Sequence, residues 1–114
     1  MRTSDVIRLR HMLEAAREAV SFAAGKTPDD LQHDRLLTLA LLKSVEIVGE
    51  AASKVDAATR ASCPEIPWDD IVGMRNRLVH VYFDVDLERI CDTVASDLPP
   101  LIASIEKILA AVRE

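Results

Sequence analysis

The sequence has few of the residues that build several common kinds of active site. It contains three glycines, two cysteines and four aromatic side chains among 114 residues. With so few glycines it lacks a phosphate-binding glycine loop, and no serine nucleophile elbow is present. The three histidines (His11, His33 and His80) are too scattered along the chain to predict a metal site. Cys63 and Cys91 also lack metal-ligand spacing, so we expect reduced thiols and a cytoplasmic setting.

The chain also has no long apolar run and no surplus of positive charge. No segment reaches the roughly 20 apolar residues that cross a bilayer, and the N-terminal residues show no signal peptide. The formal net charge of −5 argues against a broad basic face for nucleic acid. Any contact with RNA would therefore depend on a local basic patch.

What the chain does have is aliphatic residues at helical spacing. Hydrophobic residues make up 49% of it, and a core with so few aromatics favours helix packing over a sheet. Spacing and capping residues predict the following helices: one from an N-cap at Ser4 to a stop at Gly25, a short turn from Thr27 to about His33, a long helix over 36–55, a third from Pro67 through Leu78, and a fourth capped by Asp86. Pro99 and Pro100 either kink this fourth helix or separate it from a final segment over 101–112.

We therefore predict one all-α domain over residues 1–114, an antiparallel bundle of four to five helices. The final segment has more apolar residues than one seam needs, which predicts a two-fold symmetric dimer. Gly49 lies within the long helix over 36–55, which we expect to be the most buried, so a neighbouring helix should approach its backbone closely. Glu50 has two open interpretations, since it can pair with Lys54 or turn inward and orient Arg75 or Arg77.

The richest polar chemistry lies between Arg75 and Tyr82. On an ideal helix, at about 100° per residue, Asn76 and His80 share a face but Arg75 and His80 are about 140° apart. One site can use both only if the helix ends near His80 or if two chains share the site, so the spacing favours a composite dimer site. A histidine that exchanges a proton with a ribose hydroxyl or leaving oxygen, beside a guanidinium that stabilises the phosphorane, suits metal-independent RNA cleavage with a 2′,3′-cyclic phosphate product.

Structural interpretations of the same residues remain open. Arg75 and Arg77 can pair with Asp69, Asp70 or Glu50, and His80 can simply end the helix. Tyr82 can be a packed aromatic residue with a hydrogen-bonded hydroxyl.

Three stretches resemble a known family: residues 66–83, which include the Arg75–Asn76–Arg77–Leu78–Val79–His80–Val81–Tyr82 run, residues 46–52 and residues 97–101. They resemble the HepT-like branch of the HEPN superfamily. The resemblance implies a helical dimer with a cleft across its two-fold axis, acting without cofactor or metal as the ribonuclease toxin of a toxin–antitoxin pair.

The resemblance also implies roles for single residues. Arg75 and His80 would be catalytic, with Asn76 and Arg77 supporting RNA binding. Tyr82 would be the residue that a partner antitoxin, a minimal MntA-like nucleotidyltransferase, modifies with AMP from ATP. The added bulk and negative charge would then block the cleft where RNA phosphate binds.

Two other functions compete with this one. The chain can be a non-catalytic helical adaptor for a nucleotidyltransferase, which the apolar surplus of the last segment favours. It can also be the nucleotide-binding half of a split nucleotidyltransferase, with its basic motif on a nucleotide phosphate. Toxicity that depends on Arg75 would count against the adaptor. Absence of ATP binding, by the chain alone or with its partner, would exclude the split nucleotidyltransferase.

Overall fold

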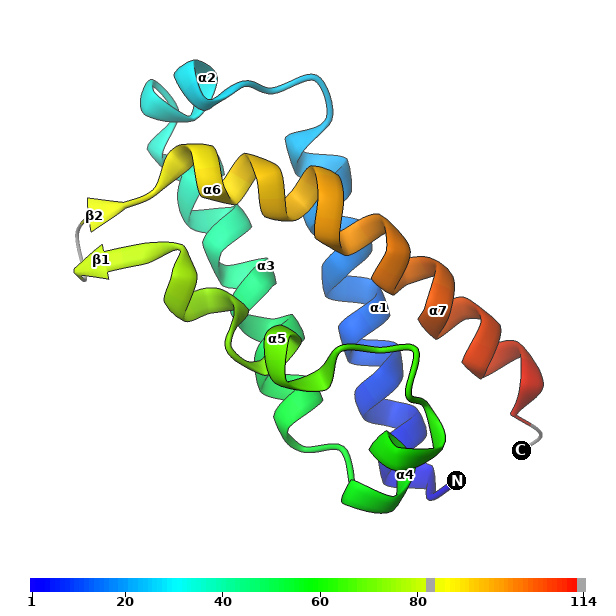
Figure 1. The fold of residues 1–114 in the computed structure, drawn as a ribbon. Helices are drawn as coiled ribbons and strands as arrows, with labels where there is room; N and C mark the ends of the chain where they lie inside the picture. Colours follow the sequence, from blue (N-terminus) through cyan, green and yellow to red (C-terminus); the bar gives the residue numbers. More distant parts are fainter. Residues whose placement is uncertain (82–83, 113–114) are drawn as a thin grey trace.

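A computed structural model describes residues 1–81 and 84–112, and helices form most of it (Figure 1). This confirms the predicted all-α class, with one small two-stranded sheet as an addition. Among the described residues, none of the helices is both long and apolar enough to cross a membrane. The elements are α1 (Thr3–Ala23), α2 (Pro28–Gln32), α3 (Arg35–Ser53), α4 (Ala57–Ser62), α5 (Trp68–Val72), the 3₁₀ turn η1 (Met74–Arg77), β1 (Val79–Val81), β2 (Asp84–Val85), α6 (Leu87–Asp92), the π turn η2 (Thr93–Asp97) and α7 (Leu98–Ala111).

The core lies between two antiparallel long helices and the segment that crosses them. In Figure 1, α1 and α3 run side by side, and α6, η2 and α7 form one continuous ribbon that crosses α1. The apolar stripe predicted for the first helix faces this core, where Leu9 and Ala16 are fully buried. Gly25 lies two residues after the end of α1, close to the predicted stop, and has a φ of +74°. The predicted N-cap was wrong, because α1 starts at Thr3 after Arg2, and neither a Ser4 cap nor any other side-chain cap forms.

Two caps predicted from the sequence are confirmed. Thr27 and Asp30 form a reciprocal capping box, in which the Thr27 hydroxyl accepts from the Asp30 amide and the Asp30 carboxylate accepts from the Thr27 amide at 2.8 Å. The hydrogen bonds from Thr27 hold the pKa of Asp30 below its usual value, and the charges of Lys26 and His33 act in the same direction. Asp86 caps α6 by accepting from the Arg89 amide at 3.0 Å.

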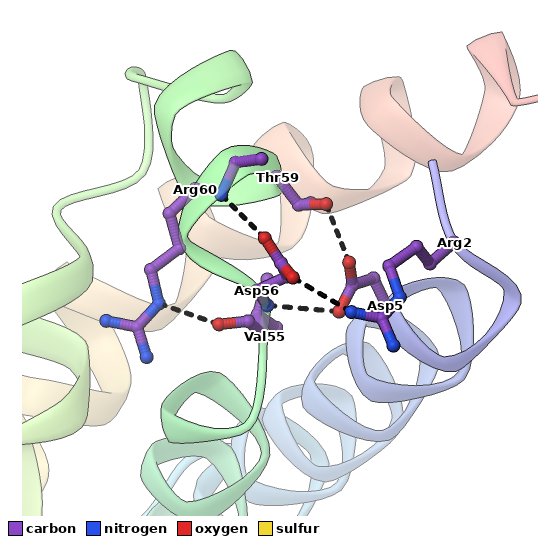
Figure 2. Close-up of polar contacts among 7 residues, drawn as sticks. Arg2, Asp5, Val55, Asp56, Thr59 and Arg60 are labelled. Carbon is purple, nitrogen blue, oxygen red and sulfur yellow. Dashed lines mark hydrogen bonds and ion pairs between the residues drawn. The ribbon is translucent and has the colours of Figure 1, made fainter.

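A buried acid joins the start of α1 to the connection after α3, a feature that we did not predict. Asp5 is 2% exposed. Its carboxylate accepts from the Asp56 amide at 3.1 Å and from the Thr59 hydroxyl at 2.7 Å, as Figure 2 shows. Asp56 in turn caps α4 and pairs with Arg2 at 2.9 Å. Each polar group taken from water therefore has a partner, as burial requires.

The loop before α5 is held by Trp68. Its indole nitrogen donates to the Cys63 carbonyl at 3.1 Å, and the ring lies 5.7 Å from the Arg60 guanidinium. Arg60 also donates to the carbonyl oxygens of Ala52 and Val55 at the end of α3. Because one guanidinium contacts both the indole and this helix end, it fixes α5 relative to α3.

The predicted third helix is much shorter than expected. It was expected to run through Leu78, but α5 ends at Val72, and the chain continues as η1 and then as the strand β1. Ile71, Met74 and Leu78 are all buried, so the predicted core residues are right although the helix is not. Gly73 is a poor helix former, and the β-branched Val79 and Val81 favour the strand. The two strands pair antiparallel through Val79 with Val85, where a linker was predicted.

The proline pair does not separate the fourth predicted helix from the last segment, because α6, η2 and α7 follow one another without a gap. Pro99 and Pro100 occupy the first turn of α7, directly after η2. A proline has no amide hydrogen to donate to the preceding turn, and the wider π turn accommodates this loss. Ser96 and Asp97 were candidate caps, but no side-chain cap forms there. Burial, with Asp92 and Asp30 nearby, raises the pKa of the half-buried Cys91 thiol.

Candidate functional site

The basic segment 75–80, called the strip below, presents polar side chains at the surface and is anchored by one buried residue just before it and one within it. Met74 is 1% exposed and Leu78 is fully buried. The Leu78 amide donates to the Arg75 carbonyl at 3.0 Å, and the Leu78 carbonyl accepts from the Asp86 amide at 2.7 Å. The backbone that carries the polar side chains is therefore fixed from both ends, while those side chains remain at the surface.

Arg75 faces α3. Its Nε lies 3.9 Å from the Glu46 carboxylate, which also accepts from Lys43 Nζ at 3.2 Å. The Arg75 side chain is 42% exposed, and an ion pair of this length at a surface contributes about 0–1 kcal/mol. Arg75 is thus oriented toward α3 but held weakly enough for an anion to compete for it.

Arg77 points to a different neighbour. Its Nη2 donates to the Asp70 carbonyl at 2.9 Å, and its Nη1 lies 3.8 Å from the Asp70 carboxylate. The structural interpretation that paired an arginine with Asp70 is therefore right for this residue. Asn76 is exposed between the two arginines, and its backbone N–H donates to the Gly73 carbonyl at 3.1 Å.

His80 lies on β1 and faces the residue that caps α6. Its Nε2 is 3.5 Å from Asp86 Oδ2, and the imidazole is 63% exposed. Sequence reasoning identified both residues but not their contact, because Asp86 was recognised only as a cap. Their proximity follows from the antiparallel strands, which return the chain alongside β1.

Two further predictions concern Tyr82 and Glu50. Tyr82 lies outside the described residues, so its predicted role stays a prediction. Within residues 1–81 and 84–112, Glu50 forms neither the pair with Lys54 nor a contact with Arg75 or Arg77. Glu46, one helical turn earlier, contacts Arg75 instead. A single sequence offers both acids at plausible spacing and cannot choose between them.

Two grooves flank the strip. The larger, about 770 Å³, lies between α5–η1 and α6–η2–α7, and includes Arg77 and Asp86. Its wall carries six acidic residues against two arginines (Glu65, Asp70, Asp86, Glu88, Asp92 and Asp97 against Arg77 and Arg89). A phosphate backbone would be repelled there. The smaller, about 250 Å³, lies between α1 and α3 and carries Arg8, His11, Lys43 and Lys54 against Glu46 and Glu50.

The smaller groove is lined by the acid that contacts Arg75. Arg8 and His11 line the same groove as Glu46, and Glu46 contacts Arg75. They are therefore linked to Arg75 through Glu46, in a groove where Arg8, Lys43 and Lys54 face two carboxylates. RNA phosphates are better accommodated on this side of the strip than in the acidic groove.

The guanidiniums and the imidazole can bind an anion and transfer a proton, but they face different elements within the chain. Arg75 contacts α3, Arg77 contacts α5, and His80 contacts the cap of α6. No described interaction joins Arg75 to His80. Among the described residues, no group of three metal-binding side chains converges. The donor set near the strip consists of guanidiniums and an imidazole, which suit phosphate binding and proton transfer.

Comparison with known proteins gives a consistent set of matches. The model of the family described as ribonuclease HepT-like matches residues 12–108. A Caldanaerobacter subterraneus subsp. tengcongensis protein named "Putative RNase TTE0752" is 33% identical over 89% of this chain and 90% of its own length. A Thermococcus cleftensis protein named "Probable ribonuclease HepT" is 32% identical over 95% of this chain and 98% of its own. No solved structure matches the chain significantly.

Proposed function

Because this chain belongs to the ribonuclease HepT-like family, we propose that it is a metal-independent endoribonuclease and the toxin of a toxin–antitoxin pair. The observation that carries the proposal is the strip 75–80, which is fixed by Leu78 and in which Arg75 and His80 are held only by long surface contacts, 3.9 Å to Glu46 and 3.5 Å to Asp86. Such pairs exchange readily for the phosphates of an RNA strand.

The reaction assigns a separate task to each side chain. The 2′-oxygen attacks the adjacent phosphorus, the bond from phosphorus to the 5′-oxygen breaks, and the products are a 2′,3′-cyclic phosphate and a 5′-hydroxyl. His80 takes the 2′-hydroxyl proton or gives one to the leaving 5′-oxygen. Arg75 stabilises the negative charge that builds on the phosphorane, while Asn76 and Arg77 help to hold the strand.

A second copy of the chain completes the site in this proposal. Within one protomer, Arg75 and His80 contact acids on different elements. A two-fold axis beside the strip would bring Arg75 of one chain to His80 of the other, in a cleft with both copies of each residue.

Regulation would act on Tyr82, two residues after His80 in the sequence. A minimal MntA-like nucleotidyltransferase would transfer AMP to its hydroxyl and release pyrophosphate from ATP. The adenylate would place a negative charge next to His80 and compete with the RNA phosphate for the cationic strip.

Product analysis with matched substrates tests the chemistry. A short RNA that the protein cleaves is compared with the same strand carrying a single 2′-deoxynucleotide at the cleaved position. The proposal predicts a cyclic phosphate from the first and no cleavage of the second at that position. Equal cleavage of both strands would show that the 2′-hydroxyl is not the nucleophile.

The second candidate is the adaptor, which exposed apolar side chains favour. The sequence suggested that these side chains would lie on the last segment, but they lie elsewhere. In α7, Leu101 and Ile105 are buried and Ile102, Ile108 and Leu109 are partly covered. The large exposed apolar side chains of the long helices lie instead on α1 and α3: Ile7, Phe22, Leu36, Leu39 and Ile47. A stable complex with a nucleotidyltransferase, without toxicity of the chain alone, would favour the adaptor.

A further inference from the structure

We propose that Asp86 is a positioning residue for His80: it holds the Nε2–H of the imidazole toward its carboxylate and leaves Nδ1 as the nitrogen that exchanges a proton with RNA. The first part of this inference concerns only the tautomer of His80. The second part rests on the proposed ribonuclease function.

The Asp86 carboxylate is fixed from two directions. Its Oδ1 accepts from the Arg89 amide at 3.0 Å, and its own amide donates to the Leu78 carbonyl at 2.7 Å. The side chain is 29% exposed, against 63% for His80. With one oxygen used by the cap and the backbone held at Leu78, the second oxygen remains free to face the imidazole.

The imidazole lies within reach of that second oxygen. Nε2 is 3.5 Å from Oδ2, and a charge-assisted bond of about 2.8 Å needs a movement of less than ~1 Å. No other hydrogen bond or ion pair to this imidazole is present among the described residues. Asp86 therefore exerts the main directional force on the ring.

The chemistry of the two groups fixes the tautomer. A neutral imidazole has one N–H donor and one bare nitrogen acceptor, whereas an ionised carboxylate can only accept. The nitrogen that faces Asp86 must therefore carry the hydrogen, and Nδ1 keeps its lone pair. A base that takes a proton from a 2′-hydroxyl needs this lone pair on the side away from its partner.

Substitution by asparagine should invert this arrangement and leave the fold intact. Asparagine is as good an N-cap as aspartate, and only its oxygen can accept from the Arg89 amide. In Asp86→Asn the NH₂ group is then left to face His80 as a donor, so Nε2 must accept and Nδ1 must carry the hydrogen. Asp86→Ser keeps a capping oxygen but is too short to reach the ring, so both tautomers should be populated.

Asp56 offers a matched control at the opposite end of the molecule. It also caps a six-residue helix through Oδ1 and faces a basic side chain, Arg2, through Oδ2. Figure 1 places α4 beside the N-terminus, far along the bundle from the two strands. Asp56→Asn removes the same charge from the same kind of cap without touching His80.

The test is nitrogen NMR of the full-length protein labelled with ¹⁵N-histidine, at about pH 9, where histidines are neutral. His80 is assigned from the signal lost in His80→Gln. We expect the Nε2–H tautomer in wild type and in Asp56→Asn, the Nδ1–H tautomer in Asp86→Asn and a mixture in Asp86→Ser. A wild-type Nδ1–H tautomer, or the same tautomer in Asp86→Asn as in wild type, would overturn the inference.

Cleavage by the same proteins separates this inference from the proposed function. With the fold retained, Asp86→Asn should lose at least about tenfold in cleavage rate, since a positioned base contributes about 10²–10⁴-fold. If all the proteins show the expected tautomers but wild type does not cleave RNA, the positioning role of Asp86 is supported and the proposed ribonuclease function is contradicted. Full cleavage by Asp86→Asn with an inverted tautomer would overturn the assignment of Nδ1.

Discussion

Gly49 of α3 lies directly against the backbone of Val72 at the end of α5. A Cβ added at Gly49 would be 3.2 Å from the carbonyl oxygens of both Val72 and Ile71. These are backbone atoms, which cannot rotate away as a side-chain tip can. The close approach predicted for this glycine is confirmed, and it sets how near the segment before Arg75 comes to the long helix.

Gly49→Ala should therefore destabilise the protein and disturb the candidate site. The added methyl group has to push α5 from α3, and overpacking of this kind costs about 1–3 kcal/mol. Urea unfolding measures the cost. Gly73→Ala is the control, because the nearest atom to its added Cβ is at an ordinary 3.4 Å. A Gly49→Ala protein as stable as wild type would show that the contact is not restrictive.

Removing the buried Asp5 carboxylate should also destabilise the fold. Asp5→Ala leaves the Asp56 amide and the Thr59 hydroxyl without their acceptor, at a cost of about 2–3 kcal/mol. Thermal unfolding should show it. Thr59→Ser keeps the hydroxyl and should lose much less. Equal losses in the two variants would indicate packing, and not the carboxylate, as the source of the effect.

Stability should fall in acid through two capping carboxylates. The hydrogen bond from the Thr27 backbone amide is the main cause that lowers the folded-state pKa of Asp30, and the hydrogen bond from the Ala58 backbone amide is the main cause that lowers that of Asp56. A lowered pKa contributes stability that is present above the unfolded-state pKa and is lost as pH falls through the folded-state pKa. The stability difference between wild type and Asp30→Asn should shrink as the pH falls through the ordinary aspartate pKa of about 3.9 and below it. A difference that stays constant in urea titrations would contradict this.

Mixing two inactive variants tests the composite site. If Arg75 of one chain serves His80 of its partner, a heterodimer of Arg75→Ala and His80→Ala keeps one intact pair. After unfolding and refolding together in equal amounts, the mixture should recover up to about a quarter of wild-type cleavage. The separately refolded variants are the control. A mixture as inactive as its components would place both residues of a site in one chain.

Much of the fold followed from local patterns in the sequence. Thr27 and Asp86 were recognised as caps because capping depends on neighbours three residues away. The short α5 was missed because Ile71, Met74 and Leu78 have helical spacing, while only Gly73 indicated a stop. The buried role of Asp5 depends on partners 51 and 54 residues away, and no local pattern encodes such a distance.

The candidate site was predicted as a set of residues but not as an arrangement. Arg75, Arg77 and His80 occupy one exposed strip, as their proximity in the sequence requires. Their partners were less predictable, since Glu46 and Glu50 both lie on the same long helix near the strip. The contact of His80 with Asp86 arises from a strand pair that the sequence reading had assigned to a linker.

Cleavage of total RNA and tRNA in EDTA, by wild type against His80→Ala, tests the central claim most directly. Both proteins must be folded, dimeric and free of AMP on Tyr82. The account predicts that wild type cleaves RNA in the chelator and that His80→Ala loses about 10²–10⁴-fold in rate. Cleavage by His80→Ala equal to that of wild type, or none by either protein, would contradict it.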